Sequence, residues 1–172
     1  MHTSARPRRA ALLCCHFTRH LAYYRAGWNA DQPNFPRIDL WATLNSNFLD
    51  IAVIEWCKLF AETKAYYSWR RVVVDPDPFI PQLFSDFGAT KVEWDIYIAK
   101  MRTYRDKFLA HLDRRNKMDI PEMELAQFAI YYLFDTMRAE KSSNVFRGLP
   151  HDLRKYSAGC KVEAAQLYAS AI

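Results

Sequence analysis

Lys100-Met-Arg-Thr-Tyr-Arg-Asp-Lys-Phe-Leu-Ala-His-Leu-Asp113 is the stretch that most clearly predicts the fold, because apolar residues recur in it at helical spacing. Taken as a helix at 100° per residue, it places Arg105 in an apolar stripe. The neighbours within about 40° of Arg105 on that helix are Trp94, Ile98, Met101, Leu109 and Leu112. Burying a guanidinium without a partner is costly, so we expect a carboxylate, backbone carbonyls or an anionic ligand beside it.

The rest of the chain also reads as helices. Thr90-Lys-Val-Glu93 is a capping box, which predicts that the motif helix starts there and runs to about Asp113. A long helix is predicted from about Ile38 to Glu62, with two apolar stripes that indicate burial from two sides. Further helices are predicted before Trp28, at Phe79–Phe87, at Glu124–Arg138, and from about Asp152 with an interruption near Gly159. Strand signals are weak, so we predict an all-α bundle of four to five substantial helices.

Length and composition indicate one folded domain over residues 1–172. Half of the residues are hydrophobic and 15% are aromatic, which is enough to form a core. Only four glycines are present, which argues against a glycine-rich nucleotide loop. No apolar run approaches the length of a transmembrane helix, so we expect no membrane partner. Residues 1–30 contain no acid, as in a targeting segment, but we favour a first helix preceded by a frayed basic tail at residues 1–8.

The cysteines predict neither a metal site nor a cofactor. The four cysteines form no CxxC pair, and Cys14-Cys15-His16 is too tightly spaced for a usual zinc half-site. We interpret them as reduced core residues, which fits a cytoplasmic protein.

Positive charge is concentrated around the motif. Residues 100–117 contain seven basic and two acidic residues, a local +5 that equals the net charge of the whole chain. A basic helix attracts polyanions by releasing their counterions, although a solvated basic face is the simpler explanation. If the partner is RNA, the residues expected to contact it are Tyr104, Lys107, Arg114 and Arg115.

A second position in the motif points to a dimer. His111 lies about 120° from Arg105 on a straight helix, so the two side chains do not point at the same spot. Two motif helices that meet about a two-fold axis could bring both residue types around one cleft. A second apolar face is available for such a partner chain and consists of Val92, Ile96, Ala99 and Ala110. We therefore predict a homodimer that forms across the motif helix.

The pattern Arg105-Asp106-x4-His111 resembles the signature of HEPN domains, which are all-helical modules. Together with Tyr23-Tyr24-Arg25 and the helix around Trp41–Phe60, it is similar to HEPN proteins of the abortive-infection type from phage defence. The resemblance implies a four-to-five-helix bundle, dimerisation across the motif and, in active members, metal-independent RNA cleavage.

The resemblance also implies roles for the motif residues. His111 would act as general base or acid on the ribose 2′-OH and the leaving oxygen. Arg105 would hold the scissile phosphate, and Asp106 could orient the arginine or the histidine. The chain shows no second fused domain, so any antitoxin would be a separate protein.

Two other interpretations remain open. The chain could be a non-catalytic module of the same fold that binds a protein, nucleotide or RNA partner. It could also be a purely structural interaction protein, in which Arg105 is neutralised within its own chain. Asp50 and Glu55 of the long helix are the expected carboxylate partners of Arg105, and such a pair is compatible with catalysis.

Overall fold

The computed structural model is a helical bundle, which confirms the predicted all-α class. It describes residues 5–30, 32–62, 64–109 and 120–171, and the side chains of 107–109 are not among the described ones. The α-helices in this part are α1 (Ala5–Ala26), α2 (Asp39–Trp56), α3 (Phe79–Phe87), α4 (Lys91–Thr103), α5 (Glu124–Glu140) and α6 (Leu153–Ser170). Two π-helical turns extend them, since η1 (Cys57–Ala61) follows α2 and η3 (Tyr104–Leu109) follows α4.

The shorter elements lie in the connections. Two 3₁₀ turns, η2 (Trp69–Arg71) and η4 (Ser143–Phe146), precede α3 and α6. A small antiparallel hairpin joins α1 to α2, in which β1 (Trp28–Asn29) pairs with β2 (Gln32–Pro33). None of the described helices is both long and apolar enough to cross a membrane.

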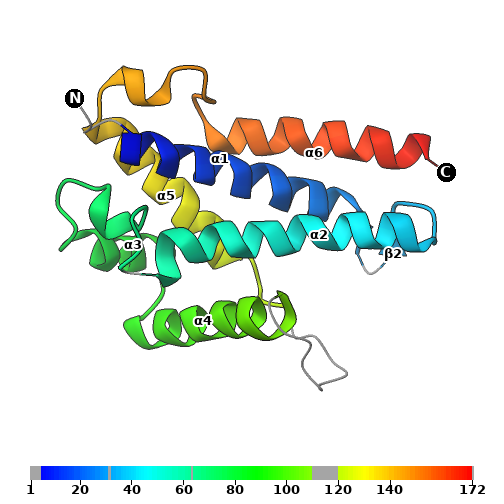
Figure 1. Ribbon diagram of the computed structural model, residues 1–172, viewed down its shortest axis with the longest axis horizontal. Coiled ribbons are helices and arrows are strands. Elements are labelled where there is room, and N and C mark those ends of the chain that lie inside the picture. Colours follow the sequence, from blue (N-terminus) through cyan, green and yellow to red (C-terminus); the bar gives the residue numbers. More distant parts are fainter. Residues whose placement is uncertain (1–4, 31, 63, 110–119, 172) are drawn as a thin grey trace.

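Helix α1 is the centre of the bundle. It lies between α2 and α6, and α5 packs against it as well (Figure 1). Helix α4 lies on the far side of α2 from α1 (Figure 1). It packs against η1, its Trp94 ring contacts Phe84 of α3, and its Tyr97 hydroxyl donates to the Glu122 carbonyl before α5.

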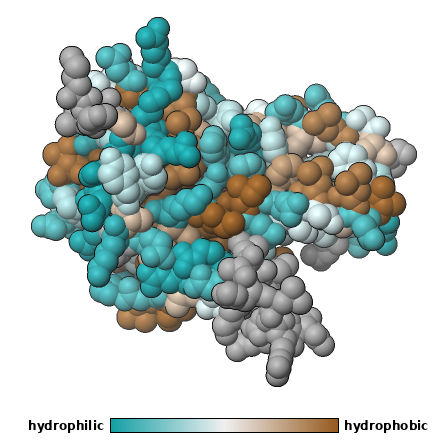
Figure 2. Space-filling model, in the orientation of Figure 1, coloured by the Kyte–Doolittle hydropathy of each residue, from teal (hydrophilic) through white to brown (hydrophobic). Residues whose placement is uncertain are grey.

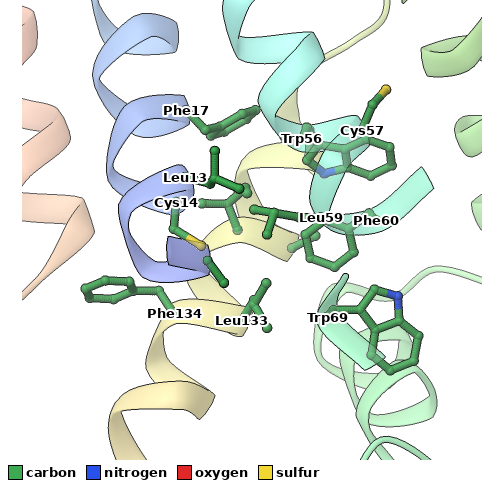
Figure 3. Close-up of a cluster of buried hydrophobic side chains, with 14 of the residues drawn as sticks. Leu13, Cys14, Phe17, Trp56, Cys57, Leu59, Phe60, Trp69, Leu133 and Phe134 are labelled. Atoms are coloured by element: carbon green, nitrogen blue, oxygen red, sulfur yellow. The ribbon is translucent and has the colours of Figure 1, made fainter. Parts of the chain in front are cut away.

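The core forms where α1, η1 and α5 meet. Figure 3 shows buried side chains from these elements, from α2 and from η2 gathered in one cluster: Leu13, Cys14, Phe17, Trp56, Cys57, Leu59, Phe60, Trp69, Leu133 and Phe134. All four cysteines are buried free thiols, as predicted. Burial raises the pKa of the Cys57 thiol to about 12, so this thiol is inert at neutral pH.

The N-terminal segment corrects one prediction. Residues 5–8 are not a frayed tail, because α1 begins at Ala5 and Pro7 is buried in its first turn, where proline is tolerated. The Arg8 guanidinium donates hydrogen bonds of 3.0 Å to the carbonyls of Val145 and Arg147. Helix α1 is therefore tied to the loop before α6 from its start.

Of the other local predictions, some are confirmed and some are wrong. Thr90 and Glu93 form the predicted capping box at the start of α4. Helix α6 runs through Gly159 without the predicted interruption. The long helix has the predicted length as α2 plus η1, but only one of its stripes is buried throughout. Leu44 and Ile51 on the other stripe are 38% and 37% exposed.

Candidate functional site

The predicted motif begins where two π-helical turns meet. The Cys57 thiol at the start of η1 donates to the Met101 carbonyl at 3.8 Å, and the Arg102 guanidinium donates to the Ala61 carbonyl at the end of η1. A cation at the carbonyl end of a helix is stabilised by the helix dipole. Because π-helical turns are frequent at functional sites, this junction of η1 with α4 and η3 is our candidate site.

Arg105 lies at this junction and is held by two carboxylates. Its Nη1 donates to Glu62 Oε1 and its Nε donates to Asp106 Oδ1, each at 2.7 Å. Hydrogen bonds to Asp106 and Glu62 raise the pKa of Arg105. The side chain is 25% exposed, so the guanidinium is fixed at the surface and stays charged.

Tyr104, the preceding residue, points the other way. It is 1% exposed, and its hydroxyl donates to Asp50 Oδ1 on α2 at 2.7 Å. Burial raises the pKa of both groups, and the bond between them adds to the rise at Tyr104. The expected RNA-binding role of Tyr104 is therefore wrong, because its ring lies in the core and leaves no face for a base.

The expected carboxylate partners of Arg105 are also corrected. Asp50 accepts a bond from Tyr104 instead, and Glu55 faces α1. The carboxylate that reaches Arg105 is Glu62, which follows η1 and lies seven residues after Glu55. On a straight α-helix Glu62 would lie within about 20° of Glu55 and two turns beyond it, but the i→i+5 turn of η1 rotates each residue by less than 100° and so shifts Glu62 away from that face.

Glu55 belongs to a second cluster that sequence reasoning missed. Its carboxylate is 6% exposed and lies 3.3 Å from His16 Nδ1 and 3.2 Å from His20 Nδ1. The two histidines are four residues apart, a spacing that places them on one face of a helix and could have been noticed. The carboxylate comes from another helix, and no local signal indicates it.

Several predicted site residues lie outside the described part of the chain. They are His111, Arg114 and Arg115, and the side chain of Lys107 is not described either. The structure brings Arg105 and Asp106 together with Glu62. The pairing of Arg105 with His111 and the RNA contacts of the basic run remain predictions.

The two faces of α4 follow the predicted pattern as far as they are described. Trp94 and Met101 on the stripe of Arg105 are buried. On the opposite face, Val92 and Ile96 are 67% and 53% exposed. An exposed apolar face next to the motif is what a partner chain would cover.

Within the described residues, no group of three or more histidine, cysteine, aspartate or glutamate side chains is arranged to hold a metal ion. Comparisons with known proteins found no matching family model, no similar curated protein and no similar solved structure.

Proposed function

We propose that this protein is a metal-independent endoribonuclease of toxin or phage-defence type, built on a HEPN-like bundle and acting in the cytoplasm. The observation that carries the proposal is the state of Arg105 in its motif. The guanidinium is accessible, charged and fixed by Glu62 and Asp106 at a π-helical turn. A preorganised cation of this kind is suited to a phosphodiester whose charge grows in the transition state.

The proposed chemistry needs few groups. The ribose 2′-oxygen attacks the adjacent phosphorus and loses its proton, the bond from phosphorus to the 5′-oxygen breaks, and that oxygen gains a proton. His111 is the proposed base or acid in these transfers. Arg105 is the proposed phosphate contact. The product ends are a 2′,3′-cyclic phosphate and a free 5′-hydroxyl.

The guanidinium retains donors for this role. An arginine has five N–H donors, and the contacts with Glu62 and Asp106 use two of them. Nucleic acid would be drawn in by the basic residues that follow, Lys107, Arg114 and Arg115. A homodimer across the exposed Val92 and Ile96 face would bring a second copy of the motif to the same cleft. An antitoxin, if the protein is a toxin, is proposed as a separate chain.

One observation favours an alternative function. The contacts of Arg105 are with two carboxylates of its own chain, as expected of a HEPN-like module that binds a protein, nucleotide or RNA partner without cutting RNA. In that case the ion pairs of Arg105 with Glu62 and Asp106 would fix the shape of the module's binding surface. Phosphate would then have to compete with Glu62 and Asp106 for the guanidinium.

An RNA-cleavage assay in EDTA separates the two functions. The wild type is compared with Arg105→Ala and His111→Ala, after circular dichroism has shown that all three fold. We expect the wild type alone to cleave, with 2′,3′-cyclic phosphate ends. Binding of RNA without cleavage would support the module, and full activity of His111→Ala would refute the proposed mechanism.

A further inference from the structure

A hollow at the start of α1 shares no residue with the Arg105 site. On the face shown in Figure 2, hydrophilic side chains cover much of the end of the molecule where α1 starts, and hydrophobic ones gather at the opposite end, where α2 begins and α6 ends. The hollow has a volume of about 650 Å³, within the range of small-molecule sites. Its lining comes from three segments: the first turn of α1, the chain from Tyr66 to Val73, and the chain from Glu140 to Val145.

Hydrogen bonds fix these three segments relative to one another. The Val74 N–H donates to Glu140 Oε2 at 2.8 Å, which ties the chain after η2 to the end of α5. The Arg8 guanidinium donates to the carbonyls of Val145 and Arg147, which ties the start of α1 to η4. The folded chain therefore forms the walls of the hollow by itself.

Two of the cations in the hollow have no anionic partner in the part of the chain that the structure describes. Arg6 is partly buried, and its guanidinium lies over the Tyr66 ring, 4.2 Å from the ring centroid. The Arg6 Nε is buried and has no hydrogen-bond acceptor there. Arg71 is exposed, and its side chain has no hydrogen bond or ion pair among the described residues. Leaving a buried cationic N–H unpaired is costly, so both guanidinium charges are available to an anion from outside the chain.

The charges around the hollow favour a dianion. Lys141 Nζ lies 3.4 Å from Glu140 Oε2, so these two charges offset each other. Arg6 and Arg71 then leave a net charge of +2 in the lining. The first turn of α1, a helix of 22 residues, contains no acid, and the dipole of a helix favours an anion at this end. A phosphate monoester carries close to two negative charges at neutral pH, and arginine matches the geometry of its oxygens.

We propose that this hollow binds a phosphate monoester, with the phosphate on Arg6 and Arg71 and the organic part against Tyr66. The Tyr66 side chain is 52% exposed, so its ring offers apolar surface beside the two cations. A sulfate ester or a carboxylate has a single charge and would leave one of the two guanidinium charges unpaired. The proposal is independent of RNA cleavage, because no bond of the ligand is broken.

Two probes of nearly the same shape test the preference for a dianion. Binding of phenyl phosphate and of phenyl sulfate to the full chain is measured by isothermal titration calorimetry at constant ionic strength. At about pH 7.5 the first probe is mainly a dianion and the second is a monoanion. We expect phenyl phosphate to bind about tenfold more tightly, the value of one hydrogen bond to a charged group. Equal affinities, or no saturation by phenyl phosphate at about 1 mM, would overturn the proposal.

Two neighbouring arginines of η2 provide a matched pair of variants. Both are exposed, but Arg70 lies over the Trp69 ring, 4.8 Å from the ring centroid, and does not line the hollow. Arg71→Gln should weaken the binding of phenyl phosphate about tenfold, and Arg70→Gln should leave it unchanged. An equal loss in both variants would show a general effect of charge and no site. Arg105→Ala should also leave binding unchanged, and a loss there would place the phosphate at Arg105 instead.

Two strands identify the source of the phosphate monoester. One 2′-O-methylated RNA strand carries a 5′-phosphate and the other carries a 5′-hydroxyl, and each is tested for displacement of phenyl phosphate. Displacement by neither strand would assign the hollow to a small soluble molecule. Displacement by the 5′-phosphorylated strand alone would assign it to the end of a nucleic acid. Equal displacement by both would show that the hollow binds phosphodiesters, which contradicts the proposed preference for a monoester.

Discussion

Arg105 Nη1 donates to Glu62 Oε1 at 2.7 Å, and this pair joins the ends of two helices that both finish in π-helical turns. Glu62 follows η1 directly, and Arg105 is the second residue of η3. Their side chains are 47% and 25% exposed. An ion pair at this exposure contributes little to folding, so its main effect is to fix the position of the guanidinium.

Loss of Arg105 should therefore leave the fold intact. We expect Arg105→Ala to lower the free energy of unfolding by less than about 1 kcal/mol, with a coupling to Glu62→Ala of about 0.2–1 kcal/mol in a double-mutant cycle. Urea denaturation of the wild type, the two single variants and the double variant measures both quantities. A loss of about 3 kcal/mol or more would show that Arg105 is a structural arginine, as expected when a buried pair is broken.

Gly27 should not tolerate a side chain. A Cβ built there would lie 2.2 Å from Nδ2 of Asn45, which is buried and bonded to Trp28, the Tyr24 carbonyl and the Tyr168 hydroxyl. Asn45 cannot move without losing these bonds. We expect Gly27→Ala to destabilise the protein by about 1–3 kcal/mol, measured as a shift of the urea midpoint.

Gly159 is the matched control for that substitution. It lies inside α6, and a Cβ there would meet nothing within 4 Å. Alanine is a better helix former than glycine, so Gly159→Ala should stabilise the protein by about 0.5–1 kcal/mol. If both substitutions destabilise alike, the clash with Asn45 does not explain the effect at Gly27.

Asp50 should make stability depend on pH. Burial raises the pKa of its carboxyl above the ordinary value, although the bond from Tyr104 opposes the shift. A carboxyl with a raised folded-state pKa stabilises the fold below its ordinary pKa of about 4, and this contribution is lost as pH rises through the folded-state value. Asp50→Asn cannot ionise and keeps an oxygen for Tyr104 to donate to. It should be more stable than the wild type at neutral pH, and the difference should shrink in acid; a difference independent of pH would contradict this assignment.

Local signals predicted much of the fold. The capping box of Thr90 and Glu93 marks the start of α4 because its two hydrogen bonds are made within four residues. The apolar stripes predicted the extent of α2 and η1, because apolar residues recur at helical spacing over that whole range. Gly159 was misleading, since a single glycine costs a helix only about 1 kcal/mol and packing on α1 outweighs it.

The candidate site was harder to predict, because it depends on how helices meet. Nothing local in the sequence marks the π-helical turns, and it is Glu62, directly after one of them, rather than Glu55 that reaches Arg105. His16 and His20 show helical spacing, yet their meaning depends on Glu55, which comes from another helix. Tyr104 was expected to contact RNA because it lies in line with His111 on a straight helix, where a tyrosine could stack on a base, but in the structure it faces Asp50 in the core.

The most direct test of the proposed function is made on the substrate. Wild-type protein in EDTA is given an RNA and, in parallel, the same sequence with every 2′-hydroxyl methylated. The account predicts that the RNA is cut to products with 2′,3′-cyclic phosphate ends and that the methylated strand stays intact, because the attacking oxygen has been blocked. Cleavage of both strands, or of neither, would contradict it.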